Sequence, residues 1–415
     1  MKRLGIILIL VAVVASLCFA SGEKEAENKT IVTFWNPYGE GSWSGEYLAT
    51  VIDKFNAENL DIKVVSQPMT DYATIIESLQ RSVAGKKLPS LVSIGYGYDR
   101  YVLNSGKAYT YDEYLDKTFF DDFFTAALEV TTFGGKVYGI PFALSVPVVF
   151  YHSDVFEAAG LDPSKAPKTW EEFVETSKII HDRLGIYGAA FALDDPWAFE
   201  CLLDSAGGSF IDTNEKLAVN SDKAKALLSD WADGTKGKYF LYNADFFETL
   251  QTFGAKQAAM FVVSSYGTVT YHESNPEIIS APIPTGSLAD RIKAPIGGNS
   301  IYLFGNSDKE REAAAKFVAY LTSPEMNAEW AKNSGYLPTR QSSLDALGSW
   351  LDGFDNYKVA IDQISNVTQP TQWPWRNVLQ INQIIMEAIE GAMLGISDPS
   401  KALDDAAEKI IPLLK

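Results

Sequence analysis

The sequence predicts an α/β fold with two domains. Its 415 residues are 47% hydrophobic and 21% charged, a composition typical of globular proteins, and this length suits two domains or one large one. Short apolar runs alternate with stretches of helical spacing, and such a β-α-β order is typical of a largely parallel sheet covered by helices. Aromatic residues make up 13% of the chain, which is enough to fill a core and to line a pocket as well.

The first predicted elements follow Thr30. Three short apolar runs predict strands at Ile31–Trp35, Ile62–Val65 and Leu91–Ile94. The two stretches between them have apolar residues at helical spacing, so they predict two helices. Their apolar faces consist of Leu48, Val51, Ile52 and Phe55, and of Tyr72, Ile76, Leu79 and Val83.

The rest of the chain continues this alternation. Thr169 with Glu172 and Ser307 with Glu310 have the spacing of capping boxes, which predicts that helices begin there. From Asn377 onward the pattern is helical apart from a break at 398–400. Extended segments are predicted at Lys136–Phe142, Val146–Tyr151, Ala258–Val263 and Ser300–Phe304.

Residues 1–20 have the pattern of a signal peptide, and 21–29 form a polar stretch that predicts a flexible leader. Lys2 and Arg3 precede an apolar run, and small residues support cleavage after Ala20. The run is shorter than the roughly 20 residues of a membrane-spanning helix. We therefore expect an exported protein, located in the periplasm or on the extracellular face of the membrane. Cleavage before Cys18 with lipid attachment stays open as an alternative, although Leu17 stands where a small residue is usual.

The net charge of −18 argues against nucleic acid and anionic membrane surfaces as partners. It does not exclude one small anion, because a single buried arginine outweighs a distant, screened field.

Catalytic and metal-binding patterns are rare in the sequence. The three histidines, His152, His181 and His272, have no partners at metal-ligand spacing, so no metal or cofactor site is expected. The adjacent carboxylates at 121–122, 194–195 and 404–405 are interpreted as solvated or capping groups. Cys201, the one cysteine left after cleavage at Ala20, lies in an apolar stretch and is expected to be buried. This pattern favours a binding protein over an enzyme.

The segment Trp373-Pro374-Trp375-Arg376-Asn377 places a guanidinium among aromatic rings. One interpretation is a packing role in which Arg376 stacks on a tryptophan. The other is an anion-binding arginine whose paired N–H donors grip a phosphate while the rings exclude water.

Several stretches resemble the extracellular solute-binding proteins that supply ABC importers. They are IVTFWNPYGEG, GKVYGIPFALSVPVVFYHSDVFEAAGLDPSKAPKTWEEF, AAMFVVSSYG, PIGGNSIYLF and NSGYLPTR, and together they cover nearly the whole mature chain. The resemblance implies a periplasmic-binding-protein-like type II fold, in which two α/β lobes are joined by a hinge and hold the ligand between them. It also implies a monomer that binds a small polar ligand and delivers it to the permease subunits of the transporter.

The same resemblance implies the extent of each lobe. The N-terminal lobe would consist of 30–143 and 295–340, and the C-terminal lobe of 144–294 and 341–415. Contacts that form only on closure would shift the hinge toward the closed state.

Within this family the sequence is most similar to the glycerol-3-phosphate-binding proteins. The resemblance implies that ligand-binding positions fall on Tyr72, Ser145, Trp197, Ser264 or Ser265, Gly297, Gly298, Tyr336 and Arg376. One position departs from the pattern, because Tyr96 stands where the family has a glutamate for ligand hydroxyls. A larger ligand, such as a glycerophosphodiester or a sugar, could stack on Tyr96.

Each of these residues also has a purely structural interpretation. The tyrosines could be core residues, the serines helix caps and the glycines a turn or bulge. Three functions therefore stay open at this point. They are capture of a glycerol phosphate or its diester, capture of a sugar on the same scaffold, and an exported hydrolase that uses an aspartate pair or Asp99.

Overall fold

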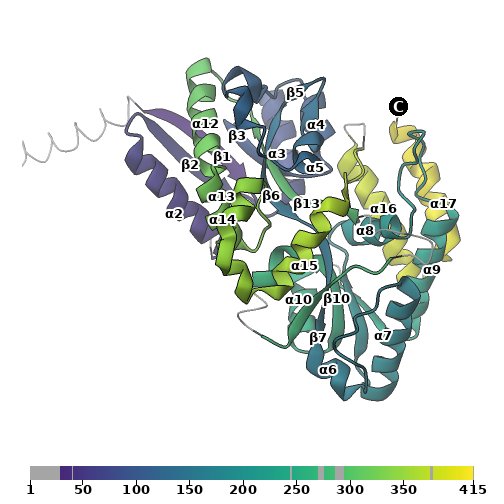
Figure 1. Cartoon of the computed structure of the whole chain (residues 1–415). Helices are drawn as coiled ribbons and strands as arrows, with labels where there is room; N and C mark the ends of the chain where they lie inside the picture. Colours follow the sequence, from purple (N-terminus) through teal and green to yellow (C-terminus); the bar gives the residue numbers. More distant parts are fainter. Residues whose placement is uncertain are drawn as a thin grey trace, which may run out of the picture.

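The computed structural model describes residues 29–39, 41–243, 245–269, 275–285, 294–373 and 377–414. The predicted signal peptide lies outside these residues. The described chain folds into two α/β lobes, each built around its own five-stranded sheet, and this confirms the predicted fold class (Figure 1). Within the described part, none of the helices combines the length and apolar character required to cross a bilayer.

The sheet of the first lobe has the strand order β2-β1-β3-β13-β6. Its first three strands run parallel, as the sequence predicts, whereas β13 runs antiparallel to both β3 and β6. The strands are β1 (Thr30–Asn36), β2 (Ile62–Pro68), β3 (Leu91–Gly95), β6 (Gly139–Ser145) and β13 (Gly297–Leu303).

The sheet of the second lobe has the order β11-β7-β10-β8-β9. Here β7 is antiparallel to β10 and β11, and β8 is parallel to β9 and β10. The strands are β7 (Pro147–His152), β8 (Tyr187–Ala192), β9 (Phe240–Asn243), β10 (Ala258–Ser264) and β11 (Ile278–Pro282).

Both sheets are therefore mixed, but each is largely parallel, as predicted, because four of its five strands run in one direction and only β13 in the first sheet and β7 in the second run against them. The reason for the opposed strand of the first sheet is the crossing of the chain between the lobes. Strand β6 ends at Ser145 and leads through Val146 directly into β7 of the other sheet, while β13 returns to the first sheet at the edge where β6 leaves it. A strand that enters where its neighbour leaves must run in the opposite direction.

Helices cover both sheets, and their apolar faces match the predicted ones closely. In α2 (Trp43–Glu58) the four predicted residues from Leu48 to Phe55 are all buried. In α3 (Tyr72–Gly85) the buried residues are Ile75, Ile76 and Leu79. Helices α12 (Asp308–Leu321) and α13 (Pro324–Ser334) complete the first lobe, where α12 contacts β1 and α13 contacts α2.

The two predicted capping boxes have different outcomes. Thr169 and Glu172 form a complete box at the start of α7 (Trp170–Leu184). Ser307 caps α12 by accepting from the Glu310 N–H, but the Glu310 carboxylate accepts from the N–H of Asn306 and the hydroxyl of Ser90 instead of closing the box. The second prediction thus holds only for the serine.

The C-terminal segment is helical, as predicted, and lies in the second lobe. Helices α16 (Val378–Met393) and α17 (Pro399–Ile410) pack against α9 (Asp222–Lys236), beside α8 (Trp197–Ser205) (Figure 1). Asp398 caps α17 and Pro399 begins it, so 398–400 start a helix where the sequence suggested a break. Cys201 of α8 is fully buried, as expected, and burial raises the pKa of its thiol.

Short strands connect the lobes beside the β6–β7 crossing. Strand β12 (Ala294–Pro295) pairs with β14 (Val367–Thr368), and only Ile296 separates β12 from β13. Two backbone hydrogen bonds fasten this region: Ile296 N–H donates to the Thr368 carbonyl at 3.0 Å, and Leu337 N–H to the Leu144 carbonyl at 2.7 Å. We propose that the hinge lies here, which would keep the lobe boundaries at 143/144, 294/295 and 340/341.

Candidate ligand-binding site

The candidate site lies where the two sheets face each other. Strands β1, β3 and β6 of the first sheet end at the edge where β13 begins, and in the second sheet β8, β9 and β10 end where β7 begins. In open α/β sheets, ligands bind outside the carboxyl ends of the strands. Residues directly after these strands are therefore the ones that can reach a ligand.

Tyr72 and Tyr336 come together in the first lobe. Tyr72 begins α3, and its ring covers Gly95 so closely that a Cβ added at Gly95 would lie 2.9 Å from it. The Tyr72 hydroxyl accepts from the Asn299 amide at 2.9 Å and is hydrogen-bonded to Tyr336. Burial raises the pKa of Tyr72 to about 12, so its hydroxyl is neutral at physiological pH.

Tyr336 also belongs to an aromatic group that reaches the second lobe. Its ring centroid lies 4.6 Å from that of Tyr266, which follows β10, and 6.1 Å from that of Trp330 in α13. The Tyr266 hydroxyl is 3.1 Å from the Ser44 hydroxyl in α2, so a hydrogen bond joins the two lobes here.

Ser145, Gly297 and Trp197 form a second convergence of predicted residues. A Cβ added at Gly297 would lie 2.5 Å from Ser145 Oγ and 3.1 Å from Trp197 Cζ2. The indole Nε1 of Trp197 is buried without a hydrogen-bond partner. A glycine at 297 thus leaves just enough room for a tryptophan of the second lobe to approach the hinge of the first.

The neighbouring Gly298 has a backbone role. Its φ is +104°, and an added Cβ would lie 2.1 Å from the Ala143 carbonyl oxygen. Only glycine fits such a conformation and such an approach. Its own carbonyl accepts from the N–H of Tyr96 at 3.3 Å, which ties the segment after β3 to the start of β13.

Ser264 and Ser265, at the end of β10, differ in what their hydroxyls do. Ser265 is fully buried, and its Oγ accepts from the Val146 N–H of the hinge at 3.2 Å. Ser264 is half-buried, and its Oγ accepts from the N–H of Tyr266 at 3.2 Å. The Ser265 hydroxyl is thus used by the connection between β6 and β7, and Ser264 is the more exposed member of the pair.

Tyr96 and Trp197 line one cavity between the lobes, of about 50 Å³. Pro370, Thr371 and Trp373, from the segment before α16, supply another wall, and Trp373 is nearly fully buried there. Arg376, Pro374 and Trp375 lie outside the described residues. Around this cavity the described lining includes Asp195 and Glu200 but no lysine or arginine; its residues are Tyr96, Gly97, Tyr98, Asp195, Pro196, Trp197, Glu200, Phe210, Pro370, Thr371, Trp373 and Asn382.

Two carboxylates fasten the segment that precedes Arg376. Asp99 of α4 (Asp99–Asn104) is fully buried and accepts from the Tyr302 hydroxyl, from Gln372 Nε2 at 2.9 Å and from the Gly97 N–H at 2.9 Å. Glu200 of α8 accepts from the Thr371 N–H at 2.6 Å. Asp99 is thus occupied in structural bonds, which weakens the hydrolase hypothesis that relied on it.

The Asp99 carboxyl predicts a pH dependence of stability. Burial raises its pKa to about 6 from the usual 3.8, although its three hydrogen bonds oppose the shift. The folded state then holds a proton that the unfolded chain has lost, so stability is complete below about pH 4 and declines as the pH rises through about 6. Relative to the wild type, Asp99→Asn should gain on the order of 2 to 3 kcal/mol between pH 4 and pH 7, as measured by urea unfolding. A pH-independent difference would contradict this account.

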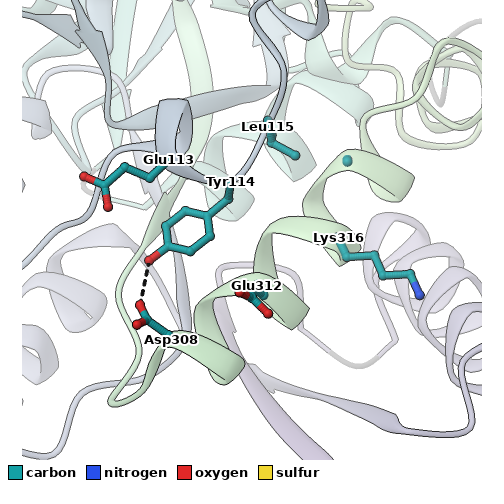
Figure 2. A pocket seen from close by; sticks show the side chains of 7 residues that line it. Glu113, Tyr114, Leu115, Asp308, Glu312 and Lys316 are labelled. Atoms are coloured by element: carbon teal, nitrogen blue, oxygen red, sulfur yellow. Dashed lines mark hydrogen bonds between the residues drawn. The ribbon is translucent and has the colours of Figure 1, made fainter.

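A larger hollow, of about 670 Å³, lies on the outside of the first lobe between Glu113–Leu115 and α12 (Figure 2). The Tyr114 hydroxyl donates to Asp308 Oδ1 at 3.4 Å and accepts from Arg311 Nε at 2.7 Å. Glu113 and Lys316 point away from Tyr114 in this view. Since its described lining comes only from the first lobe, a molecule bound there could not bridge the two lobes.

The described histidines have backbone partners. His152 Nε2 is 2.8 Å from the Phe253 carbonyl oxygen, and His181 Nδ1 is 3.0 Å from that of Ile186; His272 lies outside the described residues. Among the residues that the structure describes, no three histidine, cysteine or acidic side chains are grouped so that they could hold a metal ion.

Sequence reasoning missed several residues of this region. Tyr38, Asn299 and Tyr266 contact Tyr72 or Tyr336 directly or through one another, and Tyr98 and Asn382 line the cavity. Tyr38, Tyr98 and Tyr266 each follow a strand that ends at the interlobe edge, and this position could have drawn attention to them.

Comparisons with known proteins identify the class of this protein. Residues 50–353 match the family described as bacterial extracellular solute-binding protein, and the chain belongs to this family. It is therefore a solute-binding protein of an ABC importer, and membership implies a small ligand and permease subunits as partners.

The glycerol-3-phosphate-binding proteins are among its relatives. The sn-glycerol-3-phosphate-binding periplasmic protein UgpB of Escherichia coli (strain K12) is 25% identical over 422 residues, which cover 94% of each chain. The structure of UgpB from Mycobacterium tuberculosis in complex with glycerophosphocholine matches with a TM-score of 0.82 and 22% identity, covering 92% of this chain and 98% of that one. The structure of a solute binding protein from Thermotoga lettingae bound with α-D-tagatose matches with a TM-score of 0.81 and 21% identity, covering 93% of this chain and 100% of that one. These structural matches confirm the type II fold.

Proposed function

We propose that this protein captures glycerol 3-phosphate or a glycerophosphodiester between its lobes and presents the closed form to an ABC importer. The observation that carries the proposal is that two groups of predicted residues lie at the facing edges of the two sheets: Tyr72 with Tyr336, and Ser145 with Gly297 and with Trp197 of the second lobe. A ligand there would contact both lobes at once, so it would favour the closed state. The names of the relatives that are 25% identical over nearly the full length support this choice of ligand.

Unpartnered polar atoms support a ligand with hydroxyl groups. Trp197 Nε1 can only donate a hydrogen bond, and Asn382 Oδ1 can only accept one; both are buried without partners, and both residues line the interlobe cavity. Buried polar groups without partners cost free energy. A hydroxyl group both donates and accepts, so glycerol hydroxyls can satisfy either atom.

The phosphate would be held by Arg376 in this proposal. A guanidinium offers two parallel N–H donors to phosphate oxygens, which makes the contact strong and directional. The carboxylates of Asp195 and Glu200 line the same cavity, so an anionic group would have to sit close to Arg376 and away from them.

A sugar is the second candidate, and one observation favours it. The described cavity lining combines aromatic rings with carboxylates and contains no lysine or arginine. Such a surface suits neutral hydroxyl-rich molecules, because rings can cover sugar faces while carboxylates accept from hydroxyls. Tyr96, in place of the glutamate of the glycerol-3-phosphate-binding proteins, adds to this surface.

A ligand panel separates the candidates. The purified protein should show a raised melting temperature with sn-glycerol 3-phosphate or glycerophosphocholine, since a ligand at 100 times its Kd adds about 2.7 kcal/mol to stability. Calorimetric titration then gives Kd. Stabilisation by maltose or D-tagatose alone would reject the phosphate proposal in favour of the sugar. Turnover of glycerophosphocholine by the protein would reject both in favour of a hydrolase.

A further inference from the structure

Asn299 connects the tyrosines at the edge of the first lobe. It is fully buried in β13, directly after Gly298. Its Nδ2 donates to the Tyr38 hydroxyl at 2.5 Å and to the Tyr72 hydroxyl at 2.9 Å, and its Oδ1 accepts from the Ser93 hydroxyl at 2.8 Å. Both amide hydrogens and the amide oxygen of Asn299 thus have partners inside the protein, so the amide does not itself contact a ligand.

These bonds determine where the tyrosine hydrogens point. A tyrosine hydroxyl has one hydrogen, and it cannot point along a bond in which its oxygen accepts. Because both amide hydrogens of Asn299 are directed at tyrosine oxygens, the hydroxyl hydrogens of Tyr38 and Tyr72 must point elsewhere. The bond between Tyr336 and Tyr72 lowers the pKa of Tyr72 and raises that of Tyr336, so Tyr336 is its donor. The remaining direction for the Tyr72 hydrogen is toward the interlobe cleft, where Asp195 of the second lobe interacts electrostatically with the Tyr72 hydroxyl. The Ser93 bond holds the amide in this orientation.

We propose that Asn299 is a positioning residue that sets ligand specificity by making Tyr72 a hydrogen-bond donor to the ligand. The inference rests on the proposed function, from which it takes the contact between Tyr72 and the ligand. A donor at this place selects an acceptor oxygen, such as a phosphoryl or hydroxyl oxygen, and disfavours a group that can only donate, such as an ammonium.

A second buried asparagine in the same lobe shows what a purely structural amide does here. Asn327 is also fully buried, in α13. Its Oδ1 accepts from the Thr339 N–H at 2.8 Å and its Nδ2 donates to the Phe142 carbonyl at 3.3 Å. Asn327 therefore bonds to backbone groups and to the Thr339 hydroxyl, whereas Asn299 bonds to the tyrosines at the cleft. Asn327 provides the matched control.

The test is Asn299→Asp, which inverts the polarity of the group without changing its shape. The carboxylate still accepts from Ser93, but it now accepts from Tyr72 as well, so the Tyr72 hydrogen turns away from the ligand. The probes are sn-glycerol 3-phosphate, glycerophosphocholine and D-tagatose. For whichever of them the wild type binds, calorimetry should show a Kd that is roughly 10-fold higher in Asn299→Asp. Asn327→Asp should leave Kd unchanged, and an unchanged Kd in Asn299→Asp would overturn the proposal.

A double variant separates positioning from the added charge. In a Tyr72→Phe background, Asn299→Asp should weaken binding no further, because the hydroxyl it reorients is gone. A carboxylate that acted only by repelling a phosphate would weaken binding equally in both backgrounds, and that result would also overturn the proposal.

A ligand-free measurement covers the case in which the wild type binds none of the three probes, which would reject the proposed function itself. In protein labelled with [¹³Cζ]tyrosine, the Tyr72 signal is assigned from its loss in Tyr72→Phe. The chemical shift of this Tyr72 signal should change in Asn299→Asp, because there the Tyr72 hydroxyl donates to residue 299 instead of accepting from it. The chemical shift should stay the same in Asn327→Asp. A Tyr72 signal that does not move in Asn299→Asp would refute the orientation that Asn299 is proposed to impose.

Discussion

Replacing Arg376 with alanine should abolish capture of a phosphorylated ligand while the protein remains folded. In the proposed site Arg376 is the cation assigned to the phosphate, because the described lining of the cavity contains no lysine or arginine, and the acidic side chains of that lining would repel an anion left without the guanidinium. Truncating one partner of a buried, hydrogen-bonded charge pair costs about 2 to 5 kcal/mol. We therefore expect Kd for sn-glycerol 3-phosphate to rise by roughly 100-fold or more in calorimetric titration.

The matched control for this variant is Arg81→Ala. Arg81 is an exposed arginine of α3 that pairs with Glu77 at 3.6 Å and donates to Ser78 Oγ at 2.9 Å, both on the same helix. Its loss should leave both Kd and the melting temperature unchanged, because exposed pairs contribute little. If Arg376→Ala lowered the melting temperature strongly, or if binding survived it, the packing interpretation of the tryptophan-rich segment would be correct instead.

Substituting alanine at Gly298 should have the largest effect on folding. The added Cβ would lie 2.1 Å from a backbone carbonyl that cannot move without disturbing β6, and the φ of +104° is unfavourable for any L-residue with a side chain. We expect a loss of roughly 3 kcal/mol in the free energy of unfolding, measured in urea.

Gly297→Ala is the contrasting variant one position earlier. Its Cβ would meet Ser145 Oγ at 2.5 Å and the Trp197 ring at 3.1 Å, both of which are side chains that can shift. It should therefore cost less stability than Gly298→Ala but weaken ligand binding, because Ser145 and Trp197 are proposed ligand contacts. Equal losses of stability in the two variants would show that both glycines serve the hinge alone.

Much of the fold could be predicted from periodicity, because it depends on local patterns. The buried faces of α2 and α3 follow the helical spacing of their apolar residues, and Thr169 forms its predicted box because both partners lie within one turn. The direction of β13 could not be predicted in this way. It depends on where the chain re-enters the first sheet, which is a property of the whole topology.

The second capping box also could not be predicted from local spacing, because groups distant in sequence compete for the glutamate side chain. Glu310 has the correct spacing for a capping box, but Ser90 and Asn306 approach it in space and take its carboxylate. At the candidate site, the resemblance supplied residues such as Tyr72 and Tyr336, and the structure places them together. It could not supply Asn299, because a residue that acts through hydrogen bonds to two tyrosines has no signature of its own in sequence.

The place of β13 between β3 and β6 has a consequence for the order of assembly. This strand joins β3 to the last strand of the first sheet, yet it is made about 200 residues after β3, when the chain of the second sheet has already been synthesised. A chain that stops before Gly297 leaves β3 and β6 without the partner between them. The first lobe therefore cannot complete its sheet until β13, which follows the strands of the second sheet in sequence, has been synthesised.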